Sequence, residues 1–303
     1  MPGVAPVGGR QFAWFRIVFG VYLTVHFAQL IPYASELFSS AGALPDPSVN
    51  PIYGILPNAL AYWNTPEFAT AFVAALTVFS ILFALGIERH ATAVLLWYGW
   101  ACLFNRNVLI SNPSIPYVGL LLVLGLLVPA REPLRFGARE SKGHFYMPAA
   151  VFWTAWAIMA AGYTFSGIAK LQSPSWIDGS ALLHVLQSPL SRDSVLIDFL
   201  LAQPWLVVFT TWAVLLLEVL FVPLALFNRT RAFAWASMVA MHVAIVALID
   251  FADLSAGMLV LHLFTLDERW VSRGRVWVTG VSDDLRPLVW RVSKKQARFL
   301  PLP

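Results

Sequence analysis

The chain of 303 residues contains a single cysteine and few charged side chains. Cys102 alone supports neither an intrachain disulfide nor a cysteine-based metal site. Charged residues make up 12% of the chain, against roughly 25% in an average soluble domain. The sequence also lacks a phosphate loop, a serine nucleophile elbow, a nucleotide fingerprint and a basic stripe interleaved with aromatic residues. These absences argue against a soluble enzyme and against a nucleic-acid partner.

Hydrophobic residues, by contrast, account for 59% of the chain and include 13 tryptophans and 22 phenylalanines. Since a helix needs about 20 apolar residues to cross a bilayer, the long apolar runs predict an all-α, polytopic transmembrane bundle of about eight membrane helices. The expected segments are 12–34, 67–87, 91–110, 115–130, 148–170, 204–227, 231–250 and the shorter 254–266. The first run has no small-residue cleavage site, so we expect a membrane helix there and not a cleaved signal peptide.

The basic residues predict the orientation of these segments. If the N-terminus is inside, 17 of the 20 lysines and arginines fall on the cytoplasmic side, as the positive-inside rule requires. We therefore expect a multi-pass inner-membrane protein with both termini cytoplasmic and with the lipid bilayer as its principal partner. Residues 1–270 would form the transmembrane domain, and 271–303 a cytoplasmic tail whose tryptophans and basic residues suit the anionic inner leaflet.

Lys170 ends a run of more than twenty uncharged residues and falls at the outer end of the fifth segment. Tyr163, Ser166, Gly167 and Lys170 are three and four residues apart and so share one helix face, where Gly167 allows close approach by a neighbour. Two interpretations stay open. Lys170 either extends to the outer headgroups, or desolvation favours its neutral amine, which is a base.

Glu218 lies in the middle of the sixth segment, too far from either end to reach water. At about 1.5 Å per residue, Glu218 is about 14 Å from the inner end of its helix and Arg16 about 6 Å from the inner end of the first. A structural interpretation therefore pairs Glu218 with Arg16. A functional interpretation makes Glu218 an acid or proton relay below Lys170.

Three histidines, His26, His242 and His262, fall roughly 9–14 Å from the outer face by the same helical rise. Such a layer suits hydrogen bonding to a quinone oxygen or proton transfer. No two of them have a metal-ligand spacing such as i, i+4, so no metal site is predicted.

Further polar residues are expected on the outer side. Asp250 and Asp253 read as solvated residues of the last turn between membrane segments. A polar cluster between the third and fourth segments is expected to line the mouth of a cavity; it comprises Asn105, Arg106, Asn107, Asn112 and Ser114.

Four stretches, in this order, are "FRIVFG", "YTFSGIAKLQSPSWIDGSAL", "LLLEVLFVPLALF" and "MHVAIVALIDFADLSAGMLVLHL". Together they resemble the membrane domain shared by vitamin K-dependent gamma-glutamyl carboxylases and many bacterial proteins, the horizontally transferred transmembrane (HTTM) domain. The likeness covers roughly residues 10 to 270 and is that of a stand-alone bacterial member.

The resemblance implies a quinone-dependent oxygenase or carboxylase-like enzyme, a lyase, with a vitamin K-type hydroquinone as its cofactor. Lys170 would be the base that deprotonates the reduced quinone at the outer face. The other residues that it implies are His242 and Glu218 as supporting catalytic groups and, around the quinone, Tyr163, Ser166, Gly167, Trp176, His26 and His262.

Two parts of the carboxylases have no counterpart in this sequence. One is the large lumenal portion that grips the substrate, and the other is a histidine before the fourth helix, where this chain has Asn112, Pro113 and Ser114. The resemblance thus points to the lysine and the quinone more than to glutamate carboxylation. The alternative is a non-enzymatic membrane factor for the maturation or export of a secreted peptide, in which Lys170 and Asp178 position the peptide or pair with each other.

Overall fold

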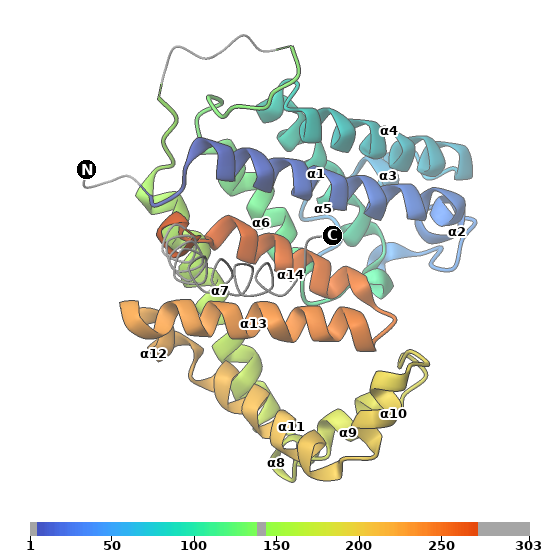
Figure 1. Ribbon diagram of the computed structural model, residues 1–303. Coiled ribbons are helices and arrows are strands. Elements are labelled where there is room, and N and C mark those ends of the chain that lie inside the picture. The colour runs from blue at the N-terminus through green and yellow to red at the C-terminus, as the bar shows by residue number, and fades with distance from the viewer. Residues whose placement is uncertain (1–4, 138–143, 272–303) are drawn as a thin grey trace, which may run out of the picture. The chain divides into compact units, whose positions relative to one another are not determined.

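A computed structural model describes residues 5–137 and 144–271, and within them the chain forms helices and loops but no strand (Figure 1). The predicted all-α fold is confirmed. The longer helices are α1 (Gly9–Leu30), α4 (Pro66–Leu85), α5 (Arg89–Arg106), α6 (Ile115–Leu126), α7 (Ala149–Lys170), α11 (Pro204–Val219), α13 (Asn228–Leu248) and α14 (Ala252–Thr265). The shorter ones are η1 (Ile31–Tyr33), α2 (Ala34–Phe38), η2 (Pro47–Val49), α3 (Ala59–Tyr62), η3 (Val108–Ile110), α8 (Pro174–Ile177), α9 (Ala181–Leu186), α10 (Val195–Leu201) and α12 (Phe221–Leu226).

Each of the eight predicted membrane segments contains a helix, and the segment 204–227 is divided into α11 and α12. By length and composition, four stretches of the described chain are able to cross a membrane: Gly9–Phe38, α4, α7 and α13. A fifth is added if α10 and α11, which are bent by 95°, count as one span. Helices α6 and α14 are apolar but shorter. The count of eight crossings is therefore not confirmed.

The bounds of α4 follow from its sequence. The Thr65 side chain accepts a hydrogen bond from the amide of Phe68, and Pro66 occupies the first helical position, where its missing N–H costs nothing. At the other end Gly86 adopts a left-handed conformation with φ of 75°, which glycine takes without strain. Both ends of this apolar helix are thus fixed by local chemistry.

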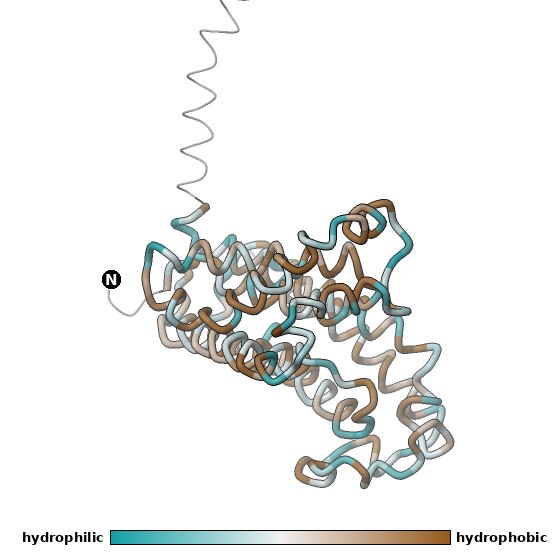
Figure 2. The backbone as a smooth tube through the Cα atoms, turned by 90° about the horizontal axis from the view of Figure 1, so that it is seen from below, coloured by the Kyte–Doolittle hydropathy of each residue, from teal (hydrophilic) through white to brown (hydrophobic). Residues whose placement is uncertain are grey.

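Large apolar side chains cover the outside of the helices in regular stripes. Exposed residues recur every three or four positions along α1 and α11, a spacing that puts them on one face. They are Trp14, Val18, Val21 and Val25 on α1, and Trp205, Phe209, Trp212 and Leu216 on α11. Figure 2 shows hydrophobic colour along the helices and hydrophilic colour mainly in the connections. Surfaces of this kind are stable in contact with lipid and not with water.

The interior is built largely from phenylalanine rings on α1. Phe12, Phe15 and Phe19 are buried one turn after another, and the Phe15 ring meets that of Phe264 on α14 edge-on, with centroids 4.8 Å apart. The Phe19 ring meets that of Phe83 on α4 in the same way. Helix α1 therefore lies between α4 and α14, as Figure 1 shows.

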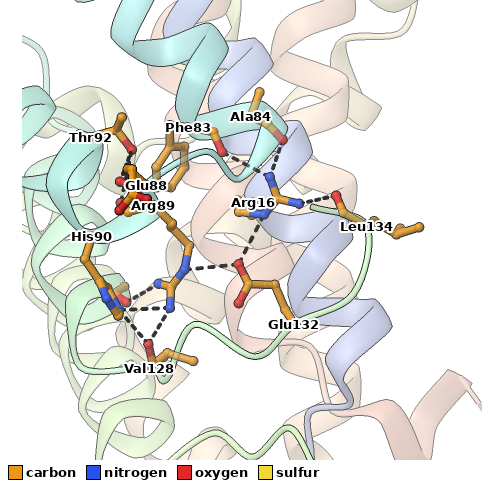
Figure 3. A network of polar contacts seen from close by, with 11 residues as sticks. Arg16, Phe83, Ala84, Glu88, Arg89, His90, Thr92, Val128, Glu132 and Leu134 are labelled. Carbon is orange, nitrogen blue, oxygen red and sulfur yellow. Dashed lines mark hydrogen bonds and ion pairs between the residues drawn. The ribbon is translucent and has the colours of Figure 1, made fainter. Parts of the chain in front are cut away.

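A buried ionic cluster holds one end of this core together (Figure 3). The carboxylate of Glu132 lies 3.4 Å from Nε of Arg16 and 3.1 Å from Nε of Arg89. Arg16 also donates to the carbonyl oxygens of Phe83, Ala84 and Leu134, the first two at the end of α4. The two arginines thus satisfy carbonyl groups that helix ends leave without intrahelical partners, and Glu132 balances part of their charge.

Arg89 acts on α6 as Arg16 acts on α4. Its guanidinium donates to the carbonyl oxygens of Gly125 and Val128 at 2.5 Å each. These carbonyls lie at the end of α6 and just beyond it. Glu132 thereby connects two cationic helix caps that come from different helices.

The polar residues at the end of α5 anchor the segment 37–52. Arg106 is 1% exposed, and its guanidinium donates to the carbonyl oxygens of Ser39 and Leu44, both at 2.7 Å. Asn107 donates to Leu37 and Asn105 to Ile52 in the same way. The side chains of Asn105, Arg106 and Asn107 thus bind carbonyl groups of the loops, and a cavity mouth at this polar cluster stays a prediction.

Replacing Arg106 with glutamine is expected to loosen the segment 39–58. The shorter amide cannot reach both carbonyls, and each buried carbonyl left without a donor costs about 1–3 kcal/mol. Thermolysin should then cut the purified protein faster at the exposed residues Ile52 and Ile55. Arg131→Gln, at an exposed arginine, is the matched control; equal cleavage rates in the two variants would contradict the anchoring role.

The chain divides into two compact units, one ending at Thr265 and the other beginning at Leu266. The sequence predicts the division at residue 270 and a cytoplasmic tail after it. That tail stays a prediction, because residues 272–303 lie outside the described part of the chain.

Candidate functional site

Lys170 is the last residue of α7, and its ammonium group has two partners. Nζ donates to the Ser166 hydroxyl, one turn earlier, at 2.7 Å and to Oε2 of Glu218 at 2.6 Å. The side chain of Lys170 is 22% exposed and that of Glu218 only 5%. The ion pair therefore has one accessible member and one enclosed member.

Glu218 is the partner of Lys170 and not of Arg16, so the pairing of Glu218 with Arg16 was wrong. Arg16 pairs with Glu132. The reason is which helices are neighbours: α11 packs against α7, whereas α1 packs against α4 and α14.

Gly167 makes the ion pair possible by bringing α7 and α11 into close contact. A Cβ atom at this position would lie 2.5 Å from the amide nitrogen of Val219 and 2.9 Å from the carbonyl carbon of Glu218. Only a residue without a side chain allows the backbones to approach so closely. Beyond Val219, α11 gives way to α12, and the amide of Val222 finds a partner in the Thr164 hydroxyl of α7.

The short helix α8 places an aromatic ring beside the pair. Nζ of Lys170 lies 5.0 Å from the centre of the Trp176 ring, a cation–π distance. Asp178, at the end of α8, does not pair with Lys170. Its carboxylate accepts from the amide of Ser180 at 2.8 Å, and hydrogen bonds from the Ser180 hydroxyl and amide lower the pKa of Asp178.

A second group of polar residues lies about two turns along α7 from Lys170. Tyr163 Oη is 2.8 Å from Nε2 of His242 on α13, and Nδ1 of that ring is 3.2 Å from the Ser255 hydroxyl on α14. The rings of His242 and His262 are 5.9 Å apart between their centroids. The structure thus brings together Tyr163, His242 and His262, three of the residues selected from the sequence.

His262 has one ring nitrogen engaged and one free of partners among the described residues. Nδ1 is 2.8 Å from the carbonyl oxygen of Met258 in the same helix. Nε2 is buried without a hydrogen-bond partner, and the ring is 5.7 Å from that of Tyr163. Because a carbonyl only accepts, Nδ1 carries the hydrogen and Nε2 of the neutral ring is an acceptor.

His26 does not join this group, because its partners are other residues; the common depth expected for the three histidines stays a prediction. Its Nδ1 lies 2.7 Å from Oδ1 of Asp253 in the first turn of α14. Tyr22 donates to the same oxygen at 3.1 Å, and Asn112 to Oδ2 at 2.9 Å. We call these four residues the Asp253 cluster. The expectation of a solvated Asp253 was wrong, since its side chain is 19% exposed.

The sequence did not identify three residues as buried partners of other polar groups. They are Glu132, which pairs with Arg16 and Arg89, Asp253, which contacts His26, and Ser255, which contacts His242. Glu132 lies in a segment rich in charges, and the other two lie near a turn, so nothing in their neighbourhood marks them as buried. Within residues 5–137 and 144–271, no group of three metal-ligating side chains is arranged to hold a metal ion.

A family model described as the HTTM domain matches residues 5–270. The chain belongs to the HTTM domain family. No curated protein and no solved structure matches the chain. This HTTM protein is a membrane protein related to the membrane domain of vitamin K-dependent carboxylases. The match includes Lys170, Glu218 and the two histidine-containing groups.

Proposed function

We propose that this HTTM protein is a membrane enzyme in which Lys170, paired with Glu218, is the base that acts on a reduced quinone at the outer face. The observation that carries the proposal is the contact of 2.6 Å between Lys170 and Glu218, a proton donor and a proton acceptor side by side. The proposal extends to a multi-pass inner-membrane protein with cytoplasmic termini, which the distribution of basic residues supports.

The donor set at Lys170 suits a reduced quinone. An amine, a carboxylate and the Ser166 hydroxyl offer partners for a phenolic hydroxyl, and the indole of Trp176 offers a flat surface for a ring. A bound hydroquinone would supply an acidic hydroxyl and two reducing electrons. Tyr163, two turns from Lys170 on α7, lies beside His242 on α13 and His262 on α14. These three residues would supply polar groups that exchange protons.

The ion pair can change its protonation state without a net change in charge. Transfer of the ammonium proton to Glu218 leaves a neutral amine at Lys170, which is then able to accept a proton from a hydroxyl group. The positive charge that the pair gains balances the negative charge left on that oxygen. Partial enclosure of the pair keeps most water away from the amine.

Lys170→Arg is the sharpest test, because arginine keeps the positive charge and the ion pair but does not become a neutral base. We expect the variant to fold and to lose about 100-fold or more of its turnover of a reduced naphthoquinone, the usual size of a general-base contribution. Turnover would be measured in proteoliposomes under oxygen, and folding by circular dichroism.

The double variant Lys170→Met with Glu218→Gln complements this test by removing both charges together. A change of Lys170 alone to an uncharged residue would leave the Glu218 carboxylate buried without a partner and destabilise the protein. The double variant leaves no such carboxylate, so a loss of turnover in it is not a consequence of unfolding. Undiminished turnover in Lys170→Arg would rule out the base role. If turnover is then lost in the double variant alone, the reaction needs the charges of the pair but not a basic amine at residue 170.

A further inference from the structure

The Asp253 cluster is separate from Lys170 in the fold. Tyr22 and His26 come from α1, Asn112 from the loop before α6, and Asp253 from α14. Lys170 and Glu218 come from α7 and α11. The two groups therefore share no helix.

The contacts of Asp253 fix the state of the His26 ring. Both carboxylate oxygens are occupied, Oδ1 by Tyr22 and His26 and Oδ2 by Asn112. Since a carboxylate only accepts, Nδ1 of His26 carries a hydrogen, and Nε2 of the neutral ring holds a lone pair. His26 is 6% exposed, and its Nε2 is buried without a partner among the described residues.

This arrangement differs from that of His262, whose Nε2 is also unpartnered. The Nδ1 partner of His262 is a neutral carbonyl, whereas that of His26 is a carboxylate. When Nε2 of His26 takes a proton, the negative charge of Asp253 stabilises the imidazolium that forms. Among the described histidines of the membrane helices, only His26 contacts a carboxylate.

Three aromatic rings lie near the imidazole of His26. The His26 ring lies 4.8 Å from that of Trp100, 5.4 Å from that of Phe27 and 6.4 Å from that of Phe104, between centroids. Among the described residues, the titratable side chains in contact with the His26 ring are those of Tyr22 and Asp253. Such surroundings favour a flat, uncharged ligand with one hydrogen to donate.

We propose that His26, held by Asp253, is a second proton-accepting site, which binds the hydroxyl group of a neutral aromatic compound at Nε2. In the transfer the O–H bond breaks, an N–H bond forms at Nε2 and the electron pair stays on the oxygen. Tyr22 and Asn112 hold the carboxylate in place and are positioning residues.

The test uses the full chain labelled with nitrogen-15 histidine and the probe 1-naphthol, which has one aromatic hydroxyl and is not a hydroquinone. The nitrogen-15 chemical shift distinguishes a ring nitrogen with a lone pair from a protonated one, and the signal lost in His26→Gln assigns the residue. Addition of 1-naphthol should move the Nε2 signal of His26 in a saturable way toward the protonated position.

Asp253→Asn should weaken this binding at least tenfold, since the charge that stabilises the imidazolium is gone. Tyr22→Phe, a milder change at the same carboxylate, should weaken it less and covers the case that Asp253→Asn does not fold. Lys170→Arg should leave the His26 response unchanged, so failure here and failure of the proposed function are distinguishable. An Nε2 signal that 1-naphthol does not move, as an ordered water alone would give, overturns the proposal.

Discussion

Replacing Gly167 with alanine is expected to push α7 and α11 apart and to lower the free energy of unfolding by about 1–3 kcal/mol. The added Cβ would lie 2.5 Å from the amide nitrogen of Val219, a backbone atom that cannot turn aside as a side chain would. Separation of the helices also lengthens the contact of Lys170 with Glu218, which is 2.6 Å in the native protein. Turnover that depends on this pair should fall together with stability.

Gly125→Ala is the matched control for this prediction. Gly125 is a buried glycine of α6, and a Cβ there would have no atom within 4 Å. Alanine is the better helix former by roughly 1 kcal/mol, so this variant should be as stable as the native protein or slightly more so. The free energies of unfolding of the two variants are measured in mixed micelles by tryptophan fluorescence. A Gly167→Ala variant as stable as Gly125→Ala would show that α7 and α11 are not tightly packed.

The helices were predictable from the sequence because their cause is local. Runs of apolar residues, Thr65 with Pro66 at the start of α4 and Gly86 at its end each act through atoms close by in the chain. The number of complete crossings was less predictable. Helix α11 breaks from α12, and α10 and α11 are bent by 95°. Both features depend on packing between helices, which cannot be predicted from the sequence of one segment.

The candidate site shows the same division between local and distant causes. The face shared by Tyr163, Ser166 and Lys170 follows from helical spacing, and the structure retains it. The need of Glu218 for a cationic partner was also predictable, because a charge inside a membrane is costly. Its partner was not, since depth along a helix does not tell which other helix lies beside it.

Asp253 and Glu132 escaped detection for a related reason. Glu132 lies among charged residues, and Asp253 lies close to a turn that also contains Asp250; both settings are typical of solvated residues. The only signals for them were indirect: Arg16 and His26, each inside an apolar run, required partners that the runs themselves do not contain. A buried polar residue therefore predicts that a partner exists more reliably than it predicts the partner's position.

Glu132→Gln is expected to have the largest effect on stability, a loss of about 3–5 kcal/mol, because it removes one partner from a buried ionic cluster. The side chains of Arg16, Arg89 and Glu132 are at most 1% exposed. Without the carboxylate, two guanidinium groups face each other with carbonyl oxygens as their remaining partners. Thermal unfolding in detergent should show a lower midpoint. Glu67→Gln, at an exposed carboxylate in the first turn of α4, should leave it nearly unchanged.

A double variant tests whether the loss comes from charge. Arg89→Met alone removes two hydrogen bonds to the end of α6 and leaves Glu132 with Arg16. Combined with Glu132→Gln, it removes one positive and one negative charge together, so the double variant should lose less stability than the sum of the two single changes. Strict additivity would mean that the carboxylate acts through its shape alone. A positive coupling would assign the cluster its electrostatic role, in which one acid allows two arginines to cap helix ends inside a membrane protein.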